Sequence, residues 1–250
     1  MRILVALILL LLPLAVEGQT RRGTLYGKVL VIDPGHGGRD PGSSRILNGQ
    51  RVAENEYVYD VALRVERLAK QQDGLFFMTL RRDEAIRNGS PAGIFVDNYT
   101  ERFTSNGSIA VAGTTGMRAR QAHGNSVVRR YPNHDVVWIS IHFDVVGTRS
   151  DVAGVRIIHA PGTKSVELAS RLAQSFGRAG RMRAHGPVAV NGDPRYGLRN
   201  LYILNGGNRT PAKVLVELGN FNNDTDLWRI RDPKVREAYA RAIVEALERR

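Results

Sequence analysis

Short apolar runs alternate along the chain with segments whose apolar residues recur every three or four positions. Apolar runs predict buried strands at Val29–Ile32, Phe76–Leu80, Val136–Ile141, Val155–Ile158 and Val214–Glu217, and the helical spacing predicts helices at Glu54–Gln71, Met117–Arg130, Ser165–Phe176 and Asp232–Leu247. Strands separated by helices favour a mostly parallel sheet covered by helices. The chain beyond residue 18 has a normal length for one domain. We therefore expect a single α/β domain with a mostly parallel, twisted sheet flanked by helices.

The first 18 residues follow a different pattern. Met1 and Arg2 form a short basic start, Ile3–Val16 is nearly all apolar, and Val16-Glu17-Gly18 offers small residues for a signal peptidase. We expect residues 1–18 to be a cleaved secretory signal and the mature protein to act in the periplasm, the cell wall or outside the cell. The alternative is an uncleaved anchor, although the run is shorter than the roughly 20 residues that a membrane span prefers. No integral membrane segment is expected in the mature chain.

Residues 83–116 interrupt the alternation of strands and helices. The segment is rich in Gly, Asn, Ser and Thr, and it is too long for an ordinary connection. We interpret it as an insertion in the domain. Two roles are equally compatible with its composition: a lid or substrate-recognition loop over the site, or a peripheral excursion.

Charge and cysteine content limit the chemistry. The net charge is +12, which favours anionic partners such as wall polymers. The arginines are scattered, and no basic patch interleaved with aromatic residues indicates nucleic-acid binding. The chain has no cysteine, so histidine and carboxylate side chains must hold any metal.

Three of the expected strands run into a chemically active side chain. His36 follows the first strand, His142 follows the strand ending at Ile141, and Glu217 ends the late strand. Ligands of open α/β sheets bind beyond the carboxyl ends of the strands, so these residues are expected to converge. Glu54 opens the next helix, and two histidines with one carboxylate are a standard ligand set for catalytic zinc. Glu217 would then be a free carboxylate beside the metal.

Four motifs in this order resemble the zinc-dependent N-acetylmuramoyl-L-alanine amidases of the amidase-3 type, which cut peptidoglycan. They are DPGHGG at 33–38, ENEYVYDVALRV at 54–65, ISIHFD at 139–144 and VLVELGN at 214–220. The resemblance implies that residues 19–250 form an amidase-3 catalytic domain in which His36, Glu54 and His142 bind one Zn²⁺ and Glu217 is catalytic. The bond cut would join the lactyl group of N-acetylmuramic acid to L-alanine.

The second ligand has two candidates, Glu54 and Glu56. In the resembling family the glutamate precedes an Asp-Ile/Val-Ala-Leu-Arg stretch by six positions, and that stretch begins here at Asp60, which favours Glu54. The chain also departs from the family pattern. Phe143-Asp144 stands where Ala-Asn is usual, and Phe221 lies one position beyond the usual aromatic, which leaves substrate detail open.

Two other functions fit the same residues. One is a zinc peptidase or amidase acting on a different peptide, because the same activation of water would serve it. The other is a wall-binding homologue that keeps the fold without catalysis. Peptidoglycan is the expected partner in the main interpretation, a protein activator is a further candidate partner, and we expect a monomer.

Overall fold

The structure is a computed structural model that describes residues 22–82, 99–179, 184–189 and 201–248. The expected signal segment, residues 1–18, lies outside the described residues, as does the first half of the expected insertion, residues 83–98.

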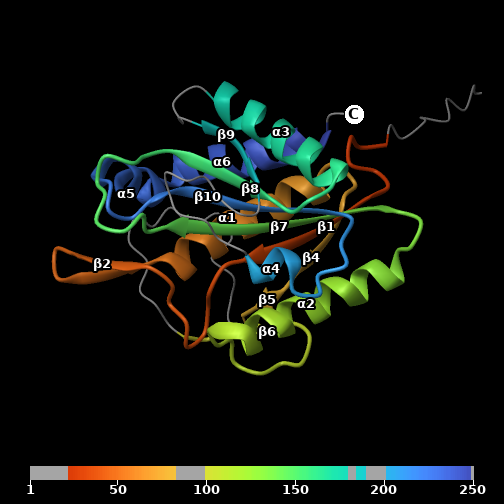
Figure 1. Cartoon of the computed structure of the whole chain (residues 1–250), viewed down its shortest axis with the longest axis horizontal. Helices are drawn as coiled ribbons and strands as arrows, with labels where there is room; N and C mark the ends of the chain where they lie inside the picture. The colour runs from red at the N-terminus through yellow and green to blue at the C-terminus, as the bar shows by residue number, and fades with distance from the viewer. Residues whose placement is uncertain (1–21, 83–98, 180–183, 190–200, 249–250) are drawn as a thin grey trace, which may run out of the picture.

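A six-stranded sheet in the order β4-β1-β7-β10-β8-β9 forms the centre of the molecule (Figure 1). Its strands are β1 (Lys28–Pro34), β4 (Leu75–Met78), β7 (Asp135–Asp144), β8 (Val155–His159), β9 (Ala184–Ala189) and β10 (Ala212–Asn220). β4, β1, β7 and β10 are parallel to one another, whereas β8 pairs antiparallel with β10 and parallel with β9. The expected α/β domain with a mostly parallel sheet is confirmed.

Helices cover both faces of this sheet. The helices are α1 (Glu54–Lys70), α2 (Gly113–Arg130), α3 (Thr163–Arg178), α4 (Tyr202–Asn205), α5 (Asp224–Arg231) and α6 (Pro233–Glu248). Apolar residues of α1, α3, α5 and α6 pack on one face, and those of α2 and α4 pack on the other (Figure 1). Strand β1 serves both layers, because Leu30 and Ile32 belong to the first core and Val29 and Val31 to the second. Burial on both faces explains why these strands read as continuous apolar runs.

Several elements differ from the sequence-based expectations. The strand expected at Phe76–Leu80 is divided at Thr79, where β4 ends and the separate β5 (Leu80–Arg81) pairs with β6 (Arg102–Phe103). Helix α2 begins at residue 113, four residues before the expected start, so its first turn belongs to the segment we interpreted as an insertion. The hairpin of β2 (Ser44–Leu47) and β3 (Gln50–Ala53), together with α4, α5 and β9, was not expected.

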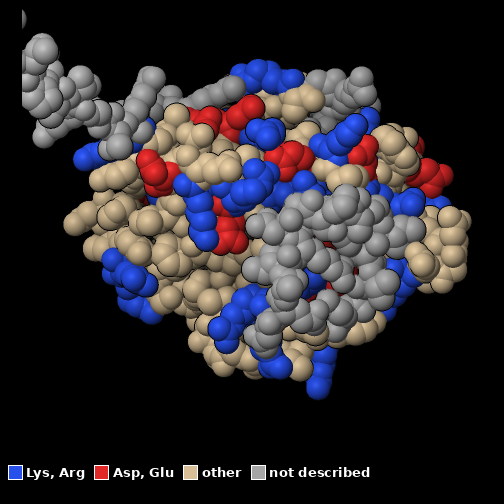
Figure 2. Space-filling view, turned by 180° about the vertical axis from the view of Figure 1, so that it is seen from behind, with Lys and Arg blue, Asp and Glu red and all other residues tan. Residues whose placement is uncertain are grey.

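The distribution of surface charge and the apolar character of the helices relate to two expected kinds of partner, anionic polymers and membranes. On the face shown in Figure 2, basic and acidic side chains are interspersed over the part of the chain that is described. Among the described residues, the structure contains no helix both long enough and apolar enough to cross a membrane.

Candidate active site

The turn after β1 presents His36 through unusual backbone geometry. His36 has φ 62°, and the two following glycines, Gly37 and Gly38, have φ 110° and 60°. Glycine adopts positive φ without a steric penalty, whereas histidine does so rarely. The first glycine of the motif, Gly35, has no positive φ, and a Cβ atom at this position would overlap the imidazole of His142. Gly35 therefore makes room for His142, and the other two glycines make the turn.

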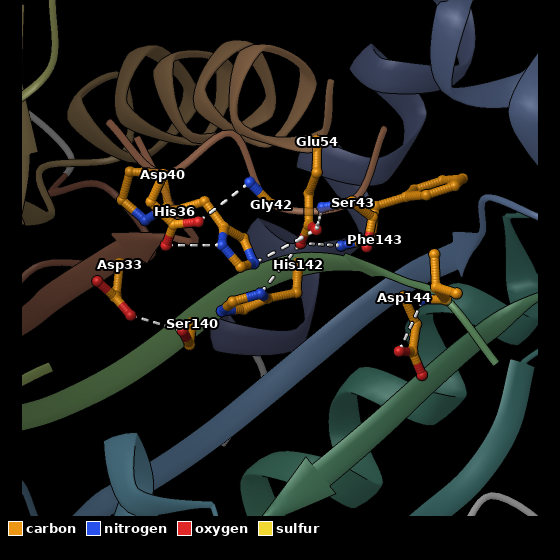
Figure 3. A network of polar contacts seen from close by, with 12 residues as sticks. Asp33, His36, Asp40, Gly42, Ser43, Glu54, Ser140, His142, Phe143 and Asp144 are labelled. Carbon is orange, nitrogen blue, oxygen red and sulfur yellow. Dashed lines mark hydrogen bonds and ion pairs between the residues drawn. The ribbon is translucent and has the colours of Figure 1, made fainter. Parts of the chain in front are cut away.

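Glu54 lies between the two imidazoles at the start of α1 (Figure 3). One carboxylate oxygen lies 3.3 Å from His36 Nε2, and the other lies 3.1 Å from His142 Nδ1. The backbone N–H groups of Ser43 and Phe143 donate to the same carboxylate at 3.0 and 2.8 Å. Glu54 is therefore held by Ser43, just before the β2–β3 hairpin, and by Phe143 of β7.

His36, Glu54 and His142 each offer one donor atom, and these atoms lie within 4.8 Å of one another. The imidazole rings of His36 and His142 are nearly perpendicular, with centroids 5.0 Å apart. A carboxylate oxygen of Asp40 lies 3.0 Å from the other ring nitrogen of His36, which orients that ring (Figure 3). The structure thus brings together the three residues that the sequence suggested as metal ligands.

The carboxylates around His36 favour a positive charge at its imidazole. Burial alone would lower the pKa of His36, but the neighbouring Glu54 and Asp40 carboxylates raise it to about 10. Burial alone would raise the pKa of Glu54, but the two histidines hold it well below its usual value. The carboxylates therefore favour a cation beside them, and a divalent metal ion can take the place of a proton on His36.

Glu56 lies elsewhere. Its carboxylate is buried and pairs with Arg82 at 2.9 Å, and Arg82 also binds Glu101. The geometry therefore places Glu54 beside the imidazoles and directs Glu56 into a separate ion-pair network.

Glu217 reaches the same cavity from the middle of the sheet. It stands directly opposite His142 in the parallel ladder between β10 and β7, and it is only 5% exposed. Both residues line a cavity with His36 and Glu54. Apolar side chains also line the cavity: Val111, Met117, Leu201, Ile203 and Leu215. The cavity therefore combines polar groups that can bind and polarise an amide with apolar side chains that can contact apolar parts of a substrate.

Comparison with known proteins identifies the family. The model of the N-acetylmuramoyl-L-alanine amidase family, Amidase_3, matches residues 30–249. The chain belongs to this family. It is 28% identical over 228 residues to an uncharacterized cell wall amidase of Bacillus anthracis, covering 88% of this chain but only 34% of that protein, so it spans about a third of that relative's length. It is 22% identical over 227 residues to the germination-specific N-acetylmuramoyl-L-alanine amidase of Bacillus subtilis, covering 90% and 80% of the two chains.

Solved amidase structures share the fold. The N-acetylmuramoyl-L-alanine amidase AmiC2 of Nostoc punctiforme superimposes with a TM-score of 0.61 at 21% identity, covering 90% of this chain and 96% of that one. The CwlD amidase of Clostridioides difficile, solved in complex with the GerS lipoprotein, gives 0.61 at 19% identity and covers 88% and 95%. At these identities the likeness establishes the architecture of the amidase domain.

The departures from the family pattern leave the geometry of the cluster intact. Phe143 points away from the cluster into the core, where its ring packs edge-on against Phe221 at 4.8 Å between centroids. The two phenylalanines that depart from the family pattern therefore pack against each other. Asp144 lines the cavity and forms a buried ion pair with Arg156 of β8.

Sequence reasoning missed several residues of the amidase site. Asp40, Glu101 and Arg120 were not predicted, although each contacts the turn that carries His36. For Arg120 a signal existed, because it lies at helical spacing with Gly116, Gly124 and Val127, all of which are buried. For Glu101 the sequence held none, since the contact depends on how the segment after residue 98 folds back.

The second half of the expected insertion contributes to the site. Glu101 accepts a hydrogen bond from the backbone N–H of Gly38 at 2.8 Å, and Val111, Ala112 and Gly113 line the cavity. Val111, Ala112 and Gly113 thus form part of the cavity lining, while Glu101 supports the turn that carries His36. Whether the whole segment acts as a lid or recognition loop stays a proposal.

Proposed function

We propose that this chain is a zinc-dependent hydrolase that cuts the amide bond between N-acetylmuramic acid and L-alanine of peptidoglycan. The observation that carries the proposal is the convergence of two imidazoles and two carboxylates, those of Glu54 and Glu217, in one cavity of an amidase-family domain. Similarity to two relatives, a cell wall amidase and a germination-specific amidase, supports the substrate class.

The donor set fits zinc. Ligands about 2.0–2.1 Å from a tetrahedral zinc ion lie about 3.4 Å apart. His36 Nε2 lies 3.3 Å from one carboxylate oxygen of Glu54 and His142 Nδ1 lies 3.1 Å from the other, and one donor atom from each of the three residues lies within 4.8 Å of the other two. His36, Glu54 and His142 would hold the ion. When bound, zinc polarises the substrate carbonyl and lowers the pKa of water toward about 7.

Glu217 is proposed as the general base and then the general acid. Its carboxylate takes a proton from the attacking water, whose oxygen adds to the carbonyl carbon of the lactyl group. The same carboxyl then gives the proton to the nitrogen of L-alanine as the C–N bond breaks. Proton transfer of this kind is typically worth about 10²–10⁴-fold in rate. The place of Glu217 beside His142, across a single strand pair, supports this role.

The setting of the reaction follows from the same proposal. We place the protein outside the cytoplasm, after removal of residues 1–18, with residues 19–250 as its catalytic domain. The complex of the Clostridioides difficile amidase with a lipoprotein supports a protein activator as a candidate partner here. A monomer is proposed for the enzyme itself.

Mass spectrometry of muropeptides tests the proposal. The chain without residues 1–18 is incubated with purified peptidoglycan, with and without a chelator. Free stem peptides beginning at L-alanine are the expected product, lost with chelator and restored by zinc. Release of other fragments would indicate a zinc peptidase, and binding to intact sacculi without any product would indicate a non-catalytic wall-binding protein.

Variants assign the roles in the same assay. Glu217→Gln should keep wild-type zinc content and lose about 10²–10⁴-fold in rate. Glu54→Gln should lose zinc, whereas Glu56→Gln, whose carboxylate faces Arg82, should retain it. Zinc loss in the Glu56 variant with retention in the Glu54 variant would reverse the assignment.

A further inference from the structure

Arg120 of α2 reaches beneath the turn that carries His36. The residue is 6% exposed, and its guanidinium lies 5.7 Å from the ring centroid of Phe103. One of its terminal nitrogens donates to the backbone carbonyl of Pro34 at 2.6 Å, and the other donates to the backbone carbonyl of His36. A single planar side chain thus binds the carbonyls on both sides of Gly35.

The same guanidinium is joined to the rest of the site through Asp33. Arg120 donates to one oxygen of this buried carboxylate at 2.7 Å, and Ser140 donates to the other at 2.6 Å (Figure 3 shows the Ser140 bond). Ser140 lies two residues before His142 on β7, so both project from the same face of that strand. Arg120 and Asp33 therefore connect the two segments that carry the imidazoles.

The backbone of His36 needs such support. A non-glycine residue at φ 62° is in a region that side chains disfavour, and it persists only where its surroundings hold it. The N–H groups after His36 are bonded to other parts of the chain: Gly38 donates to Glu101, and Arg39 donates to the carbonyl of Ala110 at 2.8 Å. The carbonyl of His36 itself is held by Arg120. Rotation of the peptide bond after His36 would break this bond and release the turn.

We infer that Arg120 is a positioning residue, which holds His36 in its left-handed conformation with the imidazole facing Glu54. The inference rests on the proposed function only in taking His36 as a metal ligand. Arginine suits the task because its planar fork binds several acceptors in one fixed geometry, which the point charge of lysine does not.

Zinc affinity, measured by competition with a chromophoric chelator, tests the inference without depending on catalysis. Removing the charge at residue 120 would leave Asp33 buried without its cation, so the variant of choice is Arg120→Lys. Lysine keeps a charge beside Asp33 but cannot bind both backbone carbonyls in the same way. Arg129→Gln is the matched control, because Arg129 is an exposed residue of the same helix.

We expect Arg120→Lys to show a cooperative unfolding transition without metal and to bind zinc about 10–100-fold more weakly, as is typical when a group that orients a metal ligand is lost. Arg129→Gln should bind zinc as the wild type does. Wild-type zinc affinity in a folded Arg120→Lys protein would overturn the inference. So would the absence of any unfolding transition in that variant, which would make Arg120 a general folding residue. If the wild-type chain itself binds no zinc, the proposed function fails instead.

Discussion

Replacing Gly35 by alanine would put a methyl group where the imidazole of His142 lies. The added Cβ atom would be 2.6 Å from Nδ1 and 2.7 Å from Nε2 of that ring. The backbone at Gly35 is otherwise ordinary, so the substitution introduces a steric conflict without a φ penalty. It therefore tests whether the space beside His142 matters.

The required displacement follows from these distances. Ordinary contacts begin near 3.4 Å, and Cε1 of the ring lies closer to the added Cβ atom than either nitrogen does, so the ring must retreat by about 1 Å. The His142–Glu54 contact of 3.1 Å cannot survive such a movement unchanged. Overpacking of this kind typically costs about 1–3 kcal/mol in the free energy of unfolding. A misplacement near 1 Å can cost about 10²-fold in rate, and we expect a loss of this size in muropeptide release.

Three measurements check the expectation: zinc affinity by chelator competition, the free energy of unfolding by urea titration, and the rate of stem-peptide release. Gly177→Ala is the matched control, because Gly177 lies in α3 with no atom within 4 Å of an added Cβ. That variant should be neutral or slightly more stable, since alanine favours a helix. A Gly35→Ala enzyme with wild-type zinc affinity and rate would refute the view that Gly35 is needed for the approach of His142.

Two further predictions concern the buried and half-buried charges between α1 and α6. Asp60→Asn should lower the free energy of unfolding by about 3–5 kcal/mol, because it leaves the buried Arg64 and Arg236 without their shared carboxylate. Urea titration measures the free energy of unfolding, and a decrease well below that range would contradict the prediction. Burial alone would raise the pKa of Glu237, but its ion pair with Arg67 at 2.7 Å helps to lower it below the usual 4.5. The pair therefore contributes stability above about pH 4.5, and this stability is lost as the pH falls. The thermal midpoint of Glu237→Gln should decline less steeply in acid than that of the wild type. Parallel declines of the two midpoints would contradict this prediction.

Long periodic segments were predictable from the sequence. The helix expected at Glu54–Gln71 is observed as α1 at Glu54–Lys70, and the helix expected at Asp232–Leu247 is observed as α6 at Pro233–Glu248. In the second case Asp232 caps the helix by accepting from the N–H of Lys234 at 2.8 Å. Apolar spacing and terminal residues carry this information locally, so no tertiary contact is needed to predict it.

Short elements and the division at Thr79 were not predictable in the same way. The side chain of Thr79 donates to Asp33 at 2.5 Å, and its backbone N–H binds the carbonyl of Ile32. These partners lie more than 40 residues away in the sequence. The β2–β3 hairpin was not predictable for another reason: its largely exposed residues show no apolar alternation strong enough to predict strands.

The meeting of His36, His142 and Glu217 was predictable because strand ends of a parallel sheet share one edge. Glu54, which opens a helix, joined this set through its place in the chain and the family resemblance. The network of buried polar residues that supports them was not predictable. Asp33, Arg120 and Ser140 come from three separate elements, and each has an ordinary role available in isolation. Only their burial together identifies them as one network.

The position of β10 has a consequence for when the enzyme can act. This strand is the last in the sequence, yet it lies in the interior of the sheet between β7 and β8 and carries Glu217. All three proposed metal ligands precede Glu217 by at least 75 residues, as the interval from His142 shows. A growing chain thus acquires its ligands early and its proposed base late, and the sheet cannot close before β10 arrives. We therefore expect a chain that stops before β10 to lack hydrolase activity.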